Sequence, residues 1–380
     1  MNFAPSEDVV LVRDMVRRFA EQKIRPIADE IDRTGEFPLA TIKEMAQLGL
    51  MSMLVPEEAG GTGMGVVAYS TALMEIGRAC TSHAVTTSVT NMVCEGIYRF
   101  GNQAQREYFI PRIASGEYPA GAFALTEPGA GSDAGSLRTS AVKDGDHYIL
   151  NGTKVFITSG AYAGVIMVAA KTDRELGKAG ISVILVERGT PGLKIGRKEE
   201  KMGQRASNTV LLTFEDCRVP VANLLGREGE GFRIMLGSLD GGRIGIASNS
   251  CGLARAALEA SVEYSKNRKQ FGKPISEFQA IQFKLADMHT RLEAAELLTL
   301  RAARFKEQGR PYTQEASMAK VYATEMVQWV CREAIQIHGG YGYVSEYPVE
   351  RFLRDAMAVT LYEGTSEVQR IVISRNLLGR

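Results

Sequence analysis

Residues 147–158 read HYILNGTKVFIT, two short β-prone runs on either side of Asn151-Gly152. An Asn-Gly pair between alternating apolar residues is a strong signal for a tight hairpin turn. Comparable short runs, separated by turns, lie at residues 120–125, 165–170, 181–186 and 208–214. This pattern predicts an antiparallel β domain over residues 119–230.

The residues before this segment have the 3.6-residue periodicity of helices. Ser6 stands where it can cap a helix whose apolar positions run from Val9 to Phe19 and which should end near Pro26. Further helices are predicted at residues 39–48, 66–78, 83–100 and 103–114. We therefore expect residues 1–118 to form an N-terminal all-α domain.

Residues 231–380 are helical again, in longer segments. Ser276 and Gln279 have the spacing of a capping box ahead of an apolar stripe, and a long helix is predicted from Thr313 to His338, before a Gly-Gly pair. Long amphipathic helices with short connections indicate a four-helix bundle. The predicted fold class is α+β and multidomain: an N-terminal all-α domain, a middle antiparallel β domain and a C-terminal four-helix bundle.

The composition excludes several classes of protein. The chain has 380 residues, 45% of them hydrophobic and 23% charged, with a net charge of +1, so it lacks the basic field of a nucleic-acid binder. No apolar run approaches the length of about 18 residues that a membrane span needs. The start at Met1 predicts neither a signal nor a transit peptide. Five scattered cysteines indicate reduced thiols and a cytoplasmic protein, and four histidines leave no metal site.

Four polar or glycine-rich motifs allow more than one interpretation. Residues 63–68 and 129–134 match the loose dinucleotide fingerprint, but the first has no acidic residue about 20 positions on and the second leads from a strand into more β structure, which argues against a Rossmann domain. Residues 126–133 form either an anion-binding nest or a plain surface turn. Residues 268–273 are either a phosphate clamp or cations at a helix end, and residues 240–243 either a local ion pair or a polar-ligand site.

One further stretch, residues 361–370, reads LYEGTSEVQR. Ser366 and Gln369 have the spacing of a capping box, and Val368 begins the apolar stripe of a last helix. Glu363 then lies on a short, fixed loop that can aim its carboxylate into a cleft. On spacing alone, however, it is one of 44 acidic residues.

Taken together, these motifs resemble the acyl-CoA dehydrogenase family of flavoenzymes, especially its short-chain and branched short-chain members. The resemblance covers the whole chain and preserves the order of five motifs. They are residues 125–133, LTEPGAGSD; 240–244, DGGRI; 268–272, RKQFG; 336–342, QIHGGYG; and 362–366, YEGTS. The family's fold agrees with the α, β, α order inferred above.

The resemblance implies FAD-dependent α,β-dehydrogenation of an acyl-CoA thioester, as in β-oxidation of fatty acids or degradation of branched-chain amino acids. Glu363 matches the base that removes the Cα proton while a hydride leaves Cβ for flavin N5. Burial would suit this carboxylate to the task by raising its pKa. The family also implies that the thioester carbonyl is polarised by the Glu363 backbone N–H and a ribityl hydroxyl.

The resemblance also assigns binding residues. Those matching FAD contacts are Phe123, Leu125, Thr126, Gly131, Ser132, Phe156, Thr158, Arg268, Gln270, Phe271, Gln279, Gln336, Gly340, Thr365 and Glu367. Those matching substrate contacts are Ser132, Asp240, Arg243, Tyr362 and Gly364. The set from Arg268 to Gly340 matches residues that reach FAD across a subunit contact.

Two positions depart from common family patterns. Many relatives have tryptophan where this chain has Phe156, which keeps the aromatic face but loses the indole N–H. Some relatives carry their base at the position of Gly242, which here leaves Glu363 as the candidate base.

The family implies a homotetramer, a dimer of dimers, that passes electrons to an electron-transferring flavoprotein. The alternatives are an acyl-CoA oxidase-type enzyme that uses O2, and a non-catalytic flavin or CoA-ester binding protein on the same scaffold.

Overall fold

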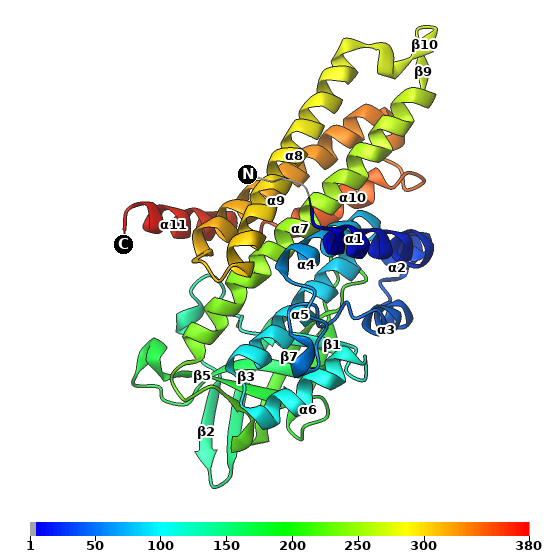
Figure 1. The fold of residues 1–380 in the computed structure, drawn as a ribbon. Coiled ribbons are helices and arrows are strands. Elements are labelled where there is room, and N and C mark those ends of the chain that lie inside the picture. The colour runs from blue at the N-terminus through cyan, green and yellow to red at the C-terminus, as the bar shows by residue number, and fades with distance from the viewer. Residues whose placement is uncertain (1–4, 380) are drawn as a thin grey trace.

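The computed structural model describes residues 5–379. Residues 1–4, on which the expectation about leader peptides partly rests, lie outside the described part. The chain begins with helices, continues as one sheet and ends with long helices (Figure 1). The predicted fold class is therefore confirmed, while the exact domain boundaries stay a prediction.

The N-terminal region is helical, with these bounds: α1 Glu7–Phe19, α2 Ala28–Thr34, α3 Leu39–Gln47, α4 Val66–Ala79, α5 Thr81–Phe100 and α6 Gln103–Ala114. Ser6 occupies the N-cap position of α1, but its side chain makes no capping hydrogen bond. The helical path does not end at Pro26, because a π turn and a 3₁₀ turn carry it from Ala20 to Ile27 and into α2. Proline is tolerated there because it stands in the first turn of the 3₁₀ segment.

The middle region is a sheet with strand order β6-β7-β3-β2-β4-β5-β8, and β1 pairs with β4. The bounds are β1 Ala120–Ala124, β2 Ser140–Asp144, β3 His147–Thr158, β4 Ala163–Lys171, β5 Ile181–Glu187, β6 Leu193–Lys198, β7 Thr209–Pro220 and β8 Leu224–Leu225. The sheet is largely antiparallel, as predicted, with parallel pairing of β2 to β4 and of β1 to β4. The β2–β3 hairpin lies between them in the chain and returns it to the end of the sheet where β1 began.

The predicted turn at Asn151-Gly152 was also wrong. Both residues lie inside the continuous strand β3, where the register with β7 shifts between Leu150 and Gly152, and the hairpin turn is at Gly145, with φ +59°. A Cβ on Gly152 would lie 2.7 Å from the Cα of Thr139. Glycine is needed there for close approach of two backbones at a bulge, and not for a turn.

The C-terminal region consists of α7 Gly231–Asn267, a small hairpin of β9 Lys269–Gln270 and β10 Lys273–Pro274, then α8 Gln279–Glu307, α9 Thr313–His338, α10 Val349–Ala358 and α11 Ser366–Leu377. The predicted capping box at α8 was wrong. Phe278 occupies the N-cap position without a capping side chain, and Ser276 belongs to a preceding 3₁₀ turn. The prediction for α9 was correct at both ends.

Helix α7 connects the three regions. It packs against α8, α9 and α10, against α4 and α5 of the N-terminal region, and against β4 and β5 of the sheet. In Figure 1 it rises from the sheet at the bottom to the β9–β10 hairpin at the top. Its middle turns are therefore buried on all sides, and the last stretch before α11 reaches them. Within the described residues, no helix combines the length and the apolar character needed to cross a membrane.

Candidate active site

Glu363 lies on a sharp turn between α10 and α11. Its φ is +53° and that of Gly364 is +86°, so two consecutive residues have the left-handed conformation, which is unfavourable for a glutamate. The side chains of Lys320 and Gln369 hold the turn. Lys320 Nζ donates to the Gly364 carbonyl at 2.8 Å, and Gln369 Nε2 donates to the carbonyls of Glu363 and Gly364 at 3.1 and 2.9 Å.

The predicted capping box of Ser366 and Gln369 at the start of α11 was wrong, both in the capping residue and in the role of Gln369. Thr365 is the N-cap, and its Oγ1 accepts from the Val368 N–H at 3.4 Å. Gln369 reaches back to the carbonyls of the turn instead of to the N-cap N–H. Its side chain stabilises the strained loop, and this role competes with capping.

The carboxylate of Glu363 lies against Gly242 of α7. A Cβ on Gly242 would come within 2.9 Å of the Glu363 Cδ and 3.0 Å of Oε1, so any other residue there would force the carboxylate to move. Oε2 is inaccessible and has no hydrogen-bond partner among residues 5–379. Burial raises the pKa of Glu363 to about 7, and the positive charges of Lys320 and Arg243 limit the rise.

Asp240 and Arg243 lie one turn apart on α7 and bind each other at 2.6 Å. Thr313 of α9 donates to the second oxygen of Asp240 at 2.7 Å, and Arg243 also contacts Ser317 at 3.3 Å. The sequence allowed either a local ion pair or a polar-ligand site. The structure shows the ion pair, buried beside the Glu363 turn.

An apolar cluster adjoins the turn. Val85, Val89 and Met92 form one face of α5 and pack against Phe123 and Tyr362. The face thus runs from the end of β1 to the residue before Glu363. An acyl chain is the kind of ligand that such a surface would accommodate.

A buried hydroxyl pair lies close to α7, near the apolar cluster. Ser88 Oγ lies 3.2 Å from Tyr69 Oη, and a Cβ on Gly245 would lie 2.5 Å from Tyr69 Oη. Gly242 and Gly245 are three residues apart on α7, which places the carboxylate and the hydroxyl pair about 4.5 Å apart along the helix axis.

The glycine-rich loop after β1, residues 125–133, is held in place by a buried lysine of the sheet. Lys154 of β3 is fully buried and donates to the Leu125 carbonyl at 3.0 Å and to Glu127 at 2.8 Å. Glu127 also accepts from the backbone N–H groups of Arg138 and Thr139. Burial acts to raise the pKa of Glu127, but Lys154 and these donors hold it below its usual value. The loop is therefore a built structure and not a plain surface turn.

The upper side of this loop is open. A Cβ on Gly129 or Gly131 would meet no atom within 4 Å, and Ser132 is exposed. Phe156 is 66% exposed and has a φ of +58° at a bulge of β3, close in the chain to the half-buried Thr158. A large aromatic side chain held outward in a strained conformation, beside an open glycine loop, forms a surface suited to a flat ring system.

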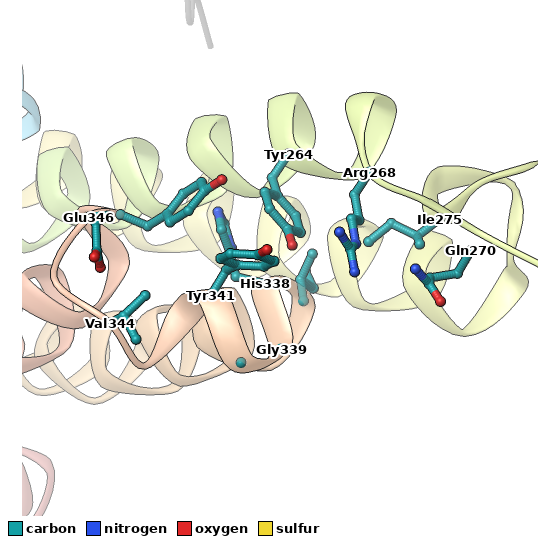
Figure 2. A pocket seen from close by; sticks show the side chains of 12 residues that line it. Tyr264, Arg268, Gln270, Ile275, His338, Gly339, Tyr341, Val344 and Glu346 are labelled. Atoms are coloured by element: carbon teal, nitrogen blue, oxygen red, sulfur yellow. The ribbon is translucent and has the colours of Figure 1, made fainter.

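The other residues predicted to bind FAD lie far from this loop. Arg268, Gln270 and Gly340 line a cavity of about 710 Å³ near the tip of the bundle, with Tyr264 and Tyr341 among its walls (Figure 2). Gln279 and Gln336 are exposed on the neighbouring helices, and Phe271 is 93% exposed at the hairpin turn. Figure 1 shows the β9–β10 hairpin and the sheet at opposite ends of the molecule. One chain alone does not bring the two sets of predicted FAD residues together.

The sequence 268–273 was predicted to be either a phosphate clamp or cations at the end of a helix that Gly272 stops. The helix ends earlier, at Asn267, and residues 269–274 form a two-residue hairpin instead. Phe271 and Gly272, with φ of +52° and +81°, form its turn.

Three family models cover nearly the whole chain. The acyl-CoA dehydrogenase N-terminal domain matches residues 6–117, the middle domain residues 122–217 and the C-terminal domain residues 229–378. The chain belongs to the acyl-CoA dehydrogenase family. It is accordingly an oxidoreductase, as its relatives are.

The short-chain specific acyl-CoA dehydrogenase of Mus musculus mitochondria is 50% identical over 97% of this chain and 89% of its own length. Butyryl-CoA dehydrogenase from Megasphaera elsdenii superposes with a TM-score of 0.97 at 43% identity and full coverage of both chains. A structure named for the electron transferring flavoprotein of Acidaminococcus fermentans gives 0.99 at 45% identity, again with full coverage. A glutaryl-CoA dehydrogenase from Mycobacterium smegmatis, in complex with FADH2, gives 0.93 at 32% identity, covering 99% of this chain and 96% of the other.

Acyl-CoA dehydrogenases depend on FAD. The residues present fit this cofactor: the glycine loop is open on one side, Phe156 presents its ring there, and a buried carboxylate oxygen without a partner lies at the Glu363 turn. Arg268 at the bundle tip supplies a cation suited to a diphosphate, next to aromatic walls.

Several residues that build the site were missed in the sequence. Lys320 interrupts the buried stripe of Ala316, Ala319 and Ala323 on α9, and a cation in such a stripe is a signal that could have been noticed. Gln204, between β6 and β7, donates to Tyr362 Oη at 3.2 Å and to the Asp355 carbonyl at 2.9 Å. No local pattern marks this link between the sheet and the Glu363 turn.

Proposed function

We propose that this chain binds FAD and converts a short acyl-CoA thioester to the trans-2-enoyl-CoA, with Glu363 as the base. The observation that carries the proposal is the buried, unpartnered Oε2 of Glu363, held over Gly242 with a pKa of about 7. A general base works best when its pKa lies near the operating pH.

Glu363 removes the proton from Cα and becomes the neutral acid, while the Cβ–H bond breaks with its electron pair. FAD, when bound, supplies the acceptor of that hydride. In this proposal the backbone N–H of Glu363 polarises the thioester carbonyl, and such a preorganised donor is typically worth about 3–4 kcal/mol. The strained turn keeps this N–H and the carboxylate on one rigid segment.

The substrate enters along α7 and α5. The side chains of Val85, Val89 and Met92 surround the acyl chain, and Tyr362 and Phe123 separate it from bulk water. The Ser88–Tyr69 hydroxyl pair favours a short chain, because it lies only about one helical turn beyond the carboxylate.

FAD is held by two groups of residues. The loop residues Phe123, Leu125, Thr126, Gly131 and Ser132, with Phe156 and Thr158, hold its flavin end; Thr365 and Glu367 stand near the Glu363 turn. The tip residues Arg268, Gln270, Phe271, Gln279, Gln336 and Gly340 complete the site of a second subunit. The separation of the two groups within one chain supports an obligate oligomer, which we propose is a homotetramer.

Mixing tests this assignment of the tip residues. Arg268→Ala should lower the FAD content of the purified protein, whereas Lys266→Ala, an exposed lysine in the last turn of α7, should leave it unchanged. Subunit exchange between Arg268→Ala and Glu363→Gln proteins should yield mixed assemblies in which some sites have both residues intact. Equal FAD content in the two single variants would contradict the assignment.

The electron acceptor is a separate part of the proposal. We infer an electron-transferring flavoprotein, supported by the similarity to the Acidaminococcus fermentans structure, and a cytoplasmic location. The test is reoxidation of the substrate-reduced protein: slow in air and fast with an electron-transferring flavoprotein. Rapid reoxidation by O2 alone would instead identify an oxidase.

The decisive experiment is anaerobic bleaching of the flavin absorbance by butyryl-CoA and a panel of longer and branched acyl-CoAs. Glu363→Gln should keep FAD and bind the ester but bleach at least 1000-fold more slowly, by analogy with the loss of a catalytic group. Glu58→Gln, on an exposed loop, is the matched control. Normal bleaching in Glu363→Gln would refute the assignment of the base.

A further inference from the structure

Lys320 is a fully buried lysine whose ammonium group has an unusual set of neighbours. Its exposed fraction is 0%, and its one hydrogen bond in the described structure goes to the carbonyl of Gly364. No carboxylate among residues 5–379 lies within 4.0 Å of its Nζ. A buried charge of this kind is costly unless a counter-charge compensates it.

The nearest compensation comes from the proposed base. Among the groups acting on Lys320, the carboxylate of Glu363 is the largest attractive one; Glu325 and Glu367 contribute less, and Arg243 repels it. Lys320 also binds the turn itself, at the carbonyl of Gly364, the residue that follows Glu363. The lysine and the carboxylate therefore form a pair without direct contact.

We propose that Lys320 is a positioning residue of this enzyme: it fixes the Glu363 turn through the Gly364 carbonyl, and its charge keeps the buried carboxylate ionised and ready to accept a proton. This inference rests on the proposed function of Glu363. It adds that a residue from α9, 43 positions earlier in the chain, controls both the place and the protonation state of the base.

The other charged and titratable groups around Glu363 do not duplicate this role. Arg243 on α7 also opposes the rise in the pKa of Glu363, less than Lys320 does, and it is bound to Asp240 at 2.6 Å. Tyr69 on α4 and Tyr362 on the turn have a pKa raised by burial, so both are neutral near pH 7. Asp355 on α10 is held by Gln204 and faces Tyr362. Among the described residues around Glu363, Lys320 is thus the cation to which no carboxylate is bound.

Three substitutions separate the two parts of the role. Lys320→Gln removes the charge but keeps an N–H donor for the Gly364 carbonyl; Lys320→Met removes both; Lys320→Arg keeps the charge. Without the charge the pKa of Glu363 should rise, so the low-pH limb of kcat/KM should move to higher pH by about 1 unit or more in Lys320→Gln. At the high-pH plateau, Lys320→Gln should nearly retain the wild-type rate. The rate of Lys320→Met there should be at least 10-fold lower than that of Lys320→Gln.

A second readout does not depend on turnover. Infrared difference spectra of the FAD-loaded protein against Glu363→Gln should show the band of the protonated carboxyl group persisting to higher pH in Lys320→Gln than in the wild-type protein. Lys284→Met, which removes a half-buried lysine paired with Glu333 on the same bundle, should leave both the pH limb and the band unchanged. FAD absorbance and melting temperature identify any variant that fails to fold.

The outcomes distinguish the role of Lys320 from the assignment of Glu363 as the base. A pH limb in Lys320→Gln that superimposes on the wild-type limb, with Glu363→Gln inactive, would overturn the role of Lys320 and leave the base intact. An active Glu363→Gln protein would overturn the base itself. A shift in Lys320→Gln with wild-type behaviour in Lys320→Arg is the result that supports the charge.

Discussion

Substituting Gly242 by alanine should separate the activity of this protein from its stability. Gly242 lies inside α7 with an ordinary helical backbone, so alanine is conformationally acceptable there. Its new methyl group, however, would come within 2.9 Å of the Glu363 Cδ and 3.0 Å of Oε1. Normal van der Waals contact begins at about 3.5 Å. The carboxylate must therefore move, by about 0.5–0.6 Å at these two atoms and by roughly 1 Å at Oε2, which would lie closest to the new methyl group.

The two consequences have opposite signs. Replacing glycine by alanine in a helix interior contributes about 1 kcal/mol of stability. The displaced atoms are the end of a flexible side chain, so the steric cost is small and the melting temperature should stay equal or rise. A misplacement of about 1 Å in a catalytic group can cost about 100-fold in rate. We expect kcat for butyryl-CoA to fall by that factor while FAD content is unchanged.

Gly237→Ala is the matched control, because it lies on the same helix and its added Cβ would meet nothing within 4 Å. It should gain the same helical stability and keep full activity. The assay is stopped-flow bleaching of the flavin, with melting curves on the same samples. If Gly242→Ala bleached at the wild-type rate, the position of the Glu363 carboxylate could not be what limits proton removal.

Three further predictions concern the supports of the site. Folding raises the pKa of Glu363 from 4.5 to about 7, so the protonated carboxyl group contributes fully to stability below pH 4.5, and this contribution is lost as the pH rises through 7. Glu363→Gln should therefore be more stable than the wild type at pH 8, by at most about 3 kcal/mol, but not at pH 4.5. Melting curves at the two pH values test this. Gln204→Leu removes the hydrogen bonds to Tyr362 and Asp355 and should cost about 1–3 kcal/mol in denaturant titrations, and an unchanged midpoint would refute the link. Lys154→Met leaves Glu127 buried without its partner and should cost about 3–5 kcal/mol, part of which a second change, Glu127→Gln, should restore; an additive double variant would contradict the pair.

The sequence was most informative where a helix end is set locally. Helix α9 runs from Thr313 to His338 as predicted, because Gly339, with φ of +62°, ends it without help from distant residues. The turn at Asn151-Gly152 was mispredicted because a hairpin signal and a bulge signal are the same dipeptide. Only the distance to Thr139, the residue before β2, distinguishes the two.

The candidate site divides in the same way. Glu363, Asp240 and Arg243 were located by motifs, and the structure brings these three together on α7 and the adjoining turn. Of the two supports of that turn, Lys320 has a signal that was overlooked, a cation within a buried helical stripe, whereas Gln204 is far from the turn in the chain and belongs to no motif. The residues at the bundle tip were located by motifs, and within one chain they lie at the opposite end of the molecule from the glycine-rich loop.

The electrostatics of the Glu363 turn follow from burial acting on two groups of opposite sign. Burial raises the pKa of Glu363 to about 7 and lowers that of Lys320 to about 8. Each group opposes the shift of the other, so the two titrate as a coupled pair. Near neutral pH the carboxylate is therefore a stronger base than an exposed glutamate, and the ammonium favours its ionised form. Once Glu363 is protonated, the ammonium group of Lys320 has lost its counter-charge, and this favours loss of that proton from Glu363. The same charge that keeps the carboxylate ionised therefore also favours release of its proton after the reaction, which a neutral residue at position 320 could not do.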